Sequence, residues 1–253
     1  MIIISVLFGF SGFAALTYQV TWIRELGSFF GIQVYATATV LTSFMAGLAL
    51  GSWLFGRWVD RMAKPLLLFA VMEIILAVYA VSFPWIVDFI GNLYLQLAPA
   101  NEGRILLSQF ARFAVTFPVL LVATSLMGGT LPVLARAVTQ KQVQLGGNIS
   151  LLYGSNNLGA FLGGFFSGYI FLATIGISGA LLVGCALNLV NAGVVFMLNS
   201  TPVPEDGSPK PAPGTQHYSA KRLMSSVNLG SAYTYPSRVT RIVLWVFAIE
   251  GFT

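Results

Sequence analysis

Six long apolar segments fill the first 199 residues of this chain, and almost every charged side chain lies between them. Only 8% of the residues are charged, and the mean hydropathy is +0.82. A soluble domain keeps about a quarter of its residues charged. A bilayer core about 30 Å thick is crossed by roughly 20 apolar residues in a helix. The pattern therefore predicts an all-α, polytopic bundle of transmembrane helices.

The apolar segments place six helices before the composition changes. A helix satisfies its own backbone hydrogen bonds, as a chain in hydrocarbon must. We take residues 1–199 as one six-helix transmembrane domain whose main partner is the lipid bilayer. The predicted helices cover about residues 2–22, 35–56, 66–87, 110–138, 149–175 and 178–198.

Two further segments follow this domain. Residues 201–214 contain five prolines, so 200–240 is predicted to be an extended, Pro-rich cytoplasmic linker. An apolar run restarts at 241–253, which is too short to cross a bilayer at 1.5 Å per residue. Its Phe-x-x-x-Gly-Phe spacing repeats that of Phe8, Gly12 and Phe13. We expect the start of a seventh helix in a truncated second half, as in transporters built from two six-helix halves.

Basic residues predict the orientation of the helices. Ten of the 13 Lys and Arg residues fall in one set of loops, and Arg24, Arg104 and Arg112 fall in the other. Basic loops stay on the cytoplasmic side of a membrane. The N-terminus is therefore predicted to be cytoplasmic, in the cell (inner) membrane.

Several classes of function are excluded by composition. The single cysteine, Cys185, and the single histidine, His217, leave no material for a disulfide, a metal cluster or Ser-His-Asp catalysis. The basic residues form no continuous patch, so no nucleic-acid partner is predicted. The chain has neither a phosphate-binding P-loop nor a Gly-rich nucleotide turn, so we predict no metal and no cofactor.

Glu73 is the leading candidate for a functional residue. It lies about eight residues into the third predicted helix, roughly 12 Å from its start. An ionisable group at that depth is a functional hypothesis by default, because it is costly in lipid. It is suited to binding a proton or an amine cation, or to bonding a neighbouring helix as a structural group.

Other polar side chains gather in two helices. Tyr153, Asn156 and Asn157 span little more than one turn of the fifth helix and either line a cavity or bond to another helix. Tyr18 and Gln19 lie near the predicted end of the first helix. Tyr18 shares a face with Trp22, and an aromatic belt at the membrane surface explains that pair most simply. A binding site is the alternative for Tyr18 and Gln19.

Small residues recur at the spacing that lets helices approach closely. Pairs of glycines four apart are typical of helix packing in membranes, and a gliding surface for conformational change is the alternative. The predicted packing glycines are Gly47, Gly51, Gly159, Gly163, Gly164 and Gly168.

The loop after the second helix reads Gly-Arg-Trp-Val-Asp-Arg, with Gly56, Asp60 and Arg61 at its key positions. It resembles the loop signature of the major facilitator superfamily. Asp60 is suited to accept bonds from backbone N–H groups at a helix start, and Arg61 to pair across the cytoplasmic face. A cytoplasmic latch of this kind and a basic turn that only fixes topology are both open.

Taken together, several segments resemble the membrane part of fused, facilitator-like spermidine-synthase-like proteins. The resemblance covers the first, second, fourth and fifth helices. It departs at Gln19, where a glutamate is common, and at Asn157, where a threonine is common. The matching segments are 12–24, 34–36, 44–51, Gly56 with Asp60 and Arg61, 126–132, and Tyr153, Asn156, 158–160, Gly163 and Gly168.

The resemblance implies a facilitator-like half that transports or binds a solute, and the expected solute is a small polyamine-type cation. In that family a cytosolic aminopropyltransferase domain often follows the membrane part. This chain contains no such domain and no catalytic motif, so enzyme activity is expected only if that domain is attached. The alternative function is therefore a membrane anchor and assembly module for a downstream aminopropyltransferase domain. The missing half, or a second copy in a homodimer, is the expected protein partner.

Overall fold

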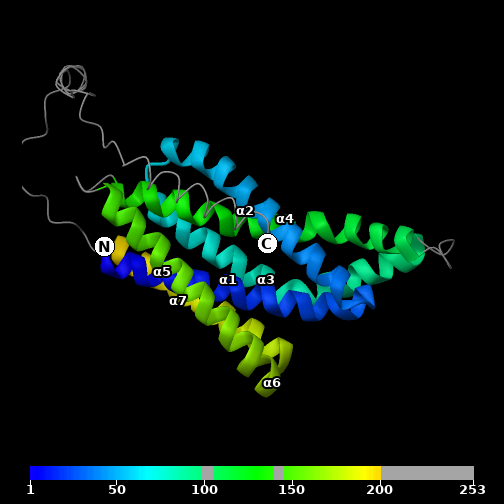
Figure 1. Cartoon of the computed structure of the whole chain (residues 1–253). Coiled ribbons are helices and arrows are strands. Elements are labelled where there is room, and N and C mark those ends of the chain that lie inside the picture. The colour runs from blue at the N-terminus through cyan, green and yellow to red at the C-terminus, as the bar shows by residue number, and fades with distance from the viewer. Residues whose placement is uncertain (98–104, 140–144, 201–253) are drawn as a thin grey trace, which may run out of the picture. The chain divides into compact units, whose positions relative to one another are not determined.

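The computed structural model describes residues 1–97, 105–139 and 145–200, and every regular element within them is a helix. Apart from Ser200, the predicted linker 200–240 and the predicted helix start 241–253 lie outside the described residues. The elements are α1 (Ile2–Phe30), α2 (Gln33–Trp58), the 3-10 turn η1 (Val59–Arg61), α3 (Pro65–Leu97), α4 (Ile105–Thr139), α5 (Leu145–Phe166), the π-helical segment η2 (Ser167–Phe171), α6 (Leu172–Thr174) and α7 (Gly176–Ser200) (Figure 1).

Six of these helical segments are long and apolar enough to cross a membrane, which confirms the predicted all-α bundle. Their lengths of 24 to 34 residues exceed the roughly 20 needed for the hydrocarbon core. Such lengths are accommodated by tilt or by ends that reach the headgroups. The chain is therefore described as a multi-pass membrane domain.

Two helices extend further than predicted. α1 continues past Trp22 to Phe30, and α3 continues past Val87 to Leu97. The prediction stopped at the first charged residues, but a helix tolerates charges in its last turns outside the hydrocarbon. α1 ends where Gly31 adopts a left-handed conformation with φ 70° and donates its N–H to Gly27 O at 3.0 Å.

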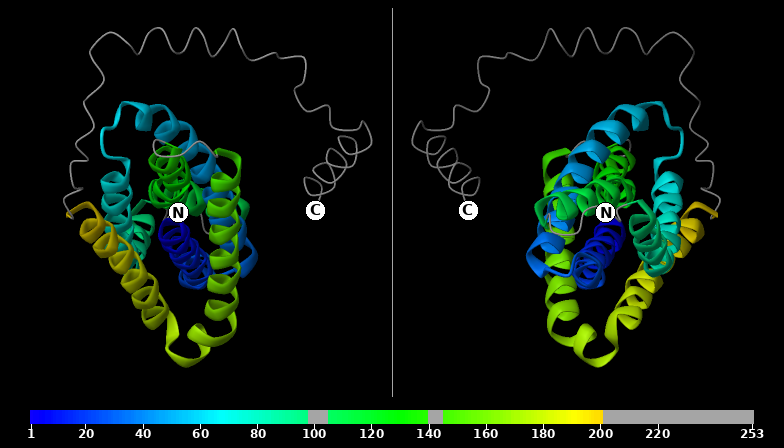
Figure 2. Two further views of the ribbon diagram at one scale, coloured as in Figure 1. Left: turned by 90° about the vertical axis from the view of Figure 1, so that its left-hand side faces the viewer. Right: turned by 90° about the vertical axis from the view of Figure 1, so that its right-hand side faces the viewer.

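α1 is the central helix of the bundle. It contacts α2, α3, α4, α5 and α7, and the end-on views show it surrounded by the others (Figure 2). The most extensive pairings are α2 with α4, α1 with α5, and α3 with α7. α5 and α7 converge on the turn around α6 and diverge from it (Figure 2). A polar residue on the inner face of α1 can therefore meet several helices at once.

Glycines let the paired helices approach to backbone contact. A Cβ on Gly159 or Gly163 of α5 would overlap the carbonyl oxygens of Gly9 or Phe13 of α1. In α2, a Cβ on Gly47 would overlap the side chain of Thr124.

The other three predicted packing glycines differ from one another in how closely a neighbouring helix approaches. A Cβ on Gly51 would overlap the carbonyl of Ser125 in α4, whereas Gly164 has only ordinary contacts with Leu16 at 3.9 Å. A Cβ on Gly168, which lies in η2, would meet no atom within 4 Å. Within the described residues no helix packs closely on this glycine, and its packing role stays a prediction.

Candidate functional site

Glu73 lies in the interior of the bundle with an exposed fraction of 0%. Ser11 Oγ of α1 donates to Glu73 Oε1 at 2.6 Å, and Asn191 Nδ2 of α7 donates to Oε2 at 3.1 Å. Within the described residues no Lys or Arg side chain forms an ion pair with Glu73. The carboxyl group therefore joins three helices through neutral partners alone.

A second hydrogen bond of the same kind lies close by. Asn188 Nδ2 of α7 donates to the hydroxyl of Tyr18 in α1 at 3.1 Å. Asn188 and Asn191 are three residues apart, and Ser11 and Tyr18 are seven apart, so each pair shares one helix face. We call Ser11, Tyr18, Glu73, Asn188 and Asn191 the buried polar cluster.

The predicted aromatic belt at the end of α1 is wrong. Tyr18 and Trp22 are 0% and 1% exposed, and their rings stack with centroids 5.8 Å apart. Trp22 also stacks on Phe83 of α3 at 4.8 Å. Because α1 continues for two more turns, these rings lie inside the bundle and not at its rim. Gln19 is also buried. It forms no hydrogen bond with Glu73, and it does not line the cavity among α1, α2, α4 and α5.

A cavity of about 270 Å³ lies among α1, α2, α4 and α5. α5 contributes the three polar residues predicted there, and α2 and α4 contribute apolar groups such as Phe44 and Met127. Ser11 belongs both to this cavity and to the buried polar cluster. The polar side chains that line it are Ser11, Ser52, Thr130, Tyr153, Asn156 and Asn157.

Some of these side chains are already engaged and others are free to bind. Asn156 Nδ2 donates to Phe8 O at 3.1 Å, and Ser52 Oγ donates to Gly128 O at 2.9 Å. Tyr153 is 57% exposed, and neither it nor Asn157 has a hydrogen-bond partner within the described part of the chain. The cavity thus offers a phenol and an amide to a solute, with Ser11 leading to a carboxyl group behind.

Three members of the buried polar cluster were not singled out from the sequence: Ser11, Asn188 and Asn191. Two amides three residues apart in an otherwise apolar helix are a usable signal, because each is costly in lipid without a partner. Ser11 gives no such signal, since serine is common in transmembrane helices and often bonds its own backbone.

The predicted latch residues lie at the end of α2 (Gly56) and in η1 (Asp60 and Arg61). Asp60 Oδ1 lies 3.8 Å from Arg136 Nε near the end of α4. Asp60 thus pairs with a side chain and not with the backbone N–H groups that were predicted. Arg61 is exposed and forms no ion pair within the described ranges. Gly56 faces Pro132 at an ordinary distance of 4.0 Å.

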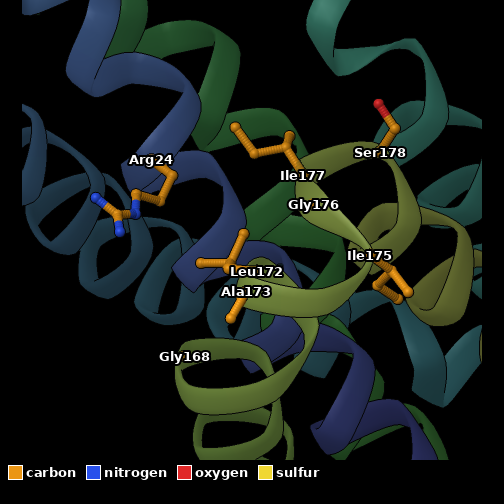
Figure 3. A pocket seen from close by; sticks show the side chains of 8 residues that line it. All are labelled: Arg24, Gly168, Leu172, Ala173, Ile175, Gly176, Ile177 and Ser178. Carbon is orange, nitrogen blue, oxygen red and sulfur yellow. The ribbon is translucent and has the colours of Figure 1, made fainter.

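A larger hollow of about 500 Å³ lies beside the turn between η2 and α7. Figure 3 shows that the guanidinium of Arg24 extends away from Ile177 and Ser178. Most of the lining comes from the single turn around Gly176, which has φ 70°. This hollow lacks converging polar groups, so the cavity beside Ser11 is the better candidate site.

Within the described residues no group of three His, Cys, Asp or Glu side chains is placed to hold a metal ion.

Comparisons with known proteins identify no relative. No protein-family model, no curated protein and no solved structure matches the chain. Its function is therefore argued from the buried polar cluster and the cavity.

Proposed function

We propose that this chain is the membrane domain of a facilitator-like, spermidine-synthase-like protein that binds and transports a small polyamine-type cation. The observation that carries the proposal is the cavity of about 270 Å³ whose polar wall leads through Ser11 to the buried carboxyl of Glu73. The volume is near the lower end for ligand pockets and suits a small, narrow solute.

The chemistry of the cavity favours a cation that carries hydrogen-bond donors. An ammonium group donates three hydrogen bonds and accepts none. The Asn157 amide oxygen accepts such bonds, and the ring of Tyr153 attracts a cation to its face. Glu73 supplies the only carboxyl group that contacts a residue of this cavity within the described residues. A positive solute therefore finds acceptors in the cavity and a countercharge one hydrogen bond behind Ser11.

The same proposal assigns the chain to the inner membrane with a cytoplasmic N-terminus. It is supported by the distribution of basic residues between the two sets of loops. It also makes the second half of a two-half transporter, or a second copy of this chain, the natural partner on the open side of the cavity.

The test is binding of radiolabelled spermidine to the purified full chain in detergent. Glu73→Gln removes the charge but keeps the shape, and losing a charge-assisted interaction lowers affinity by roughly ten- to a hundredfold. Asp88→Asn is the matched control, since Asp88 is an exposed acid on the same helix. Equal affinity in Glu73→Gln and the wild type would count against the proposal.

The second candidate function is a membrane anchor for a downstream aminopropyltransferase domain. The close backbone contacts of α1 with α5 and of α2 with α4 favour it, because interlocked helices suit a rigid module. The DNA that follows the last codon distinguishes the two functions. A Gly-rich nucleotide loop there supports the anchor, whereas six further apolar helices and a stop codon support the transporter.

A further inference from the structure

We propose that Glu73 is a proton-binding site, loaded from the cavity through the Ser11 hydroxyl and held on the other side by the Asn191 amide. The site goes beyond the proposed function, because it needs no solute. Only the competition between this proton and a solute rests on the proposed cation binding.

Glu73 has no countercharge among the described residues. Glu73 is fully buried, and both of its oxygens accept hydrogen bonds from neutral groups. An ionised carboxylate held in this way is costly in a low-dielectric interior, and a bound proton removes that cost.

The helices around Glu73 place no positive charge against its carboxyl group within the described residues. α7 carries no charged side chain, and no ion pair with Glu73 is made from α1, α3 or α4 within the described residues. Tyr18 of α1 contributes a phenol to the same cluster, and its hydroxyl accepts from Asn188 Nδ2. The other titratable groups on the helices around it are the Met1 amino group, Arg24 and Glu25 at or on α1, Tyr79, Asp88 and Tyr94 on α3, Arg112 and Arg136 on α4, and Cys185 on α7.

Asn191 binds Glu73 through only one end of its amide. The amide oxygen of Asn191, Oδ1, is buried and has no hydrogen-bond donor within the described part of the chain. Asn191 therefore holds Glu73 Oε2 through Nδ2 alone and brings no charge to the carboxyl group. The buried polar cluster leaves the negative charge of an ionised Glu73 uncompensated, and a proton is the smallest ligand that neutralises it.

Ser11 connects Glu73 to the cavity. Ser11 Oγ lies 2.6 Å from Glu73 Oε1 and also lines the cavity. The volume of about 270 Å³ and the polar side chains beside Ser11 leave room for hydrogen-bonded water. A hydronium ion gives its proton to Ser11 Oγ, while the original Ser11 O–H bond breaks and its proton forms the Oε1–H bond. Water, an intact serine and a neutral carboxylic acid result, so atoms and charge balance.

A sodium ion fits the same residues less well. Sodium needs several oxygen ligands around it, yet Glu73 Oε1 and Oε2 already accept bonds from a hydroxyl and an amide N–H. Glu73 itself does not line the cavity beside Ser11. A proton needs no added space.

The experiment is infrared spectroscopy of the full chain in lipid, in sodium-free buffer, while the pH is varied. The wild type is expected to show the carbonyl band of a protonated carboxylic acid that titrates with pH. Glu73→Gln removes this band, and Asp88→Asn, at an exposed acid of the same helix, keeps it. A band that persists in Glu73→Gln, or that is absent from the wild type throughout the pH range in which it stays folded, overturns the site. Loss of the band on adding sodium at fixed pH also overturns it, in favour of a sodium site.

The route has its own readout. Ser11→Ala is expected to keep the band but to slow its hydrogen–deuterium exchange roughly tenfold, the effect of about one lost hydrogen bond. An unchanged exchange rate overturns the relay. If Glu73→Gln is not monodisperse, a lipid-soluble carbodiimide replaces it as the probe, because it modifies protonated carboxyl groups in apolar surroundings. Its mass increment must map to Glu73 and fall as the pH is raised; a label elsewhere overturns the site.

If the proposed cation binding also holds, the solute and the proton neutralise the same carboxylate and exclude each other. Adding spermidine then weakens the infrared band. A titrating band that spermidine leaves unchanged supports the proton site and overturns the shared use of Glu73, so the two failures are distinguishable.

Discussion

Gly159 of α5 lies directly against the carbonyl oxygen of Gly9 in α1, with no space for a side chain between them. The neighbouring contact is backbone, which cannot move aside as a flexible side chain does. Gly159→Ala must therefore push the two helices apart, and such overpacking costs about 1–3 kcal/mol. We expect a loss of this size in the free energy of unfolding, measured by titrating the detergent-solubilised chain with a denaturing detergent.

Gly154→Ala is the control for this effect. Gly154 lies on the same helix, five residues earlier, and a Cβ there meets no atom within 4 Å. The substitution is expected to change the free energy of unfolding by less than about 1 kcal/mol, the difference in helix propensity between the two residues. Equal losses for Gly154→Ala and Gly159→Ala would show that helix spacing is not the cause.

Tyr18→Phe tests the hydrogen bond between α1 and α7. The substitution keeps the ring stacked on Trp22 but removes the oxygen that accepts from Asn188 Nδ2. Hydrogen bonds between transmembrane helices contribute about 0.6 kcal/mol on average and up to about 1.7 kcal/mol. We expect a loss near the upper value, because Asn188 is only 1% exposed and has no water to replace the phenol.

The matched control is Tyr169→Phe, which removes the hydroxyl of a tyrosine that is 77% exposed. It is expected to leave the free energy of unfolding unchanged within error in the same denaturation assay. If Tyr18→Phe were equally silent, Asn188 would not depend on Tyr18 and the buried polar cluster would lose one of its links.

The sequence predicts that the six helices exist better than it predicts where they end. The six helices are evident from hydropathy alone, because a segment of about 20 apolar residues has few other uses. Their ends are not, since the hydropathy signal fades at Arg24 while the helical hydrogen bonds of α1 continue to Phe30. The error in the end of α1 is what made Tyr18 and Trp22 look like a belt at the membrane surface.

The sequence predicts some residues of the candidate site but not the partners that they contact. Glu73 is conspicuous as an acid within an apolar run, and the three polar residues of α5 stand out for the same reason. Their partners are not conspicuous, because Ser11 and Asn191 meet Glu73 across 62 and 118 residues of sequence. Which helices are neighbours depends on packing, and glycine spacing indicates close approach without naming the partner helix.

Asp60→Asn tests how much the predicted latch holds. Asp60 is 73% exposed at its side chain, and its oxygen lies 3.8 Å from Arg136 Nε. Exposed ion pairs of this kind contribute about 0–1 kcal/mol and are screened by salt. We expect Asp60→Asn to lower the free energy of unfolding by less than about 1 kcal/mol, and the difference to shrink as salt is added. A loss that is large and independent of salt would mean that Asp60 has a stronger role than this pair.

The orientation in the membrane is tested with two single-cysteine variants in a Cys185→Ala background. Ile32 lies between α1 and α2, Met62 lies between η1 and α3, and the two side chains are matched at 43% and 41% exposure. Because basic loops stay cytoplasmic, Met62→Cys is expected to react with a membrane-impermeant maleimide only from the cytoplasmic side, and Ile32→Cys only from the opposite side. Inside-out vesicles and intact cells give the two directions of access, and permeabilised membranes show the full extent of labelling. The reversed pattern would place the N-terminus outside the cytoplasm, and labelling of both variants from one side would mean that α2 does not cross the bilayer.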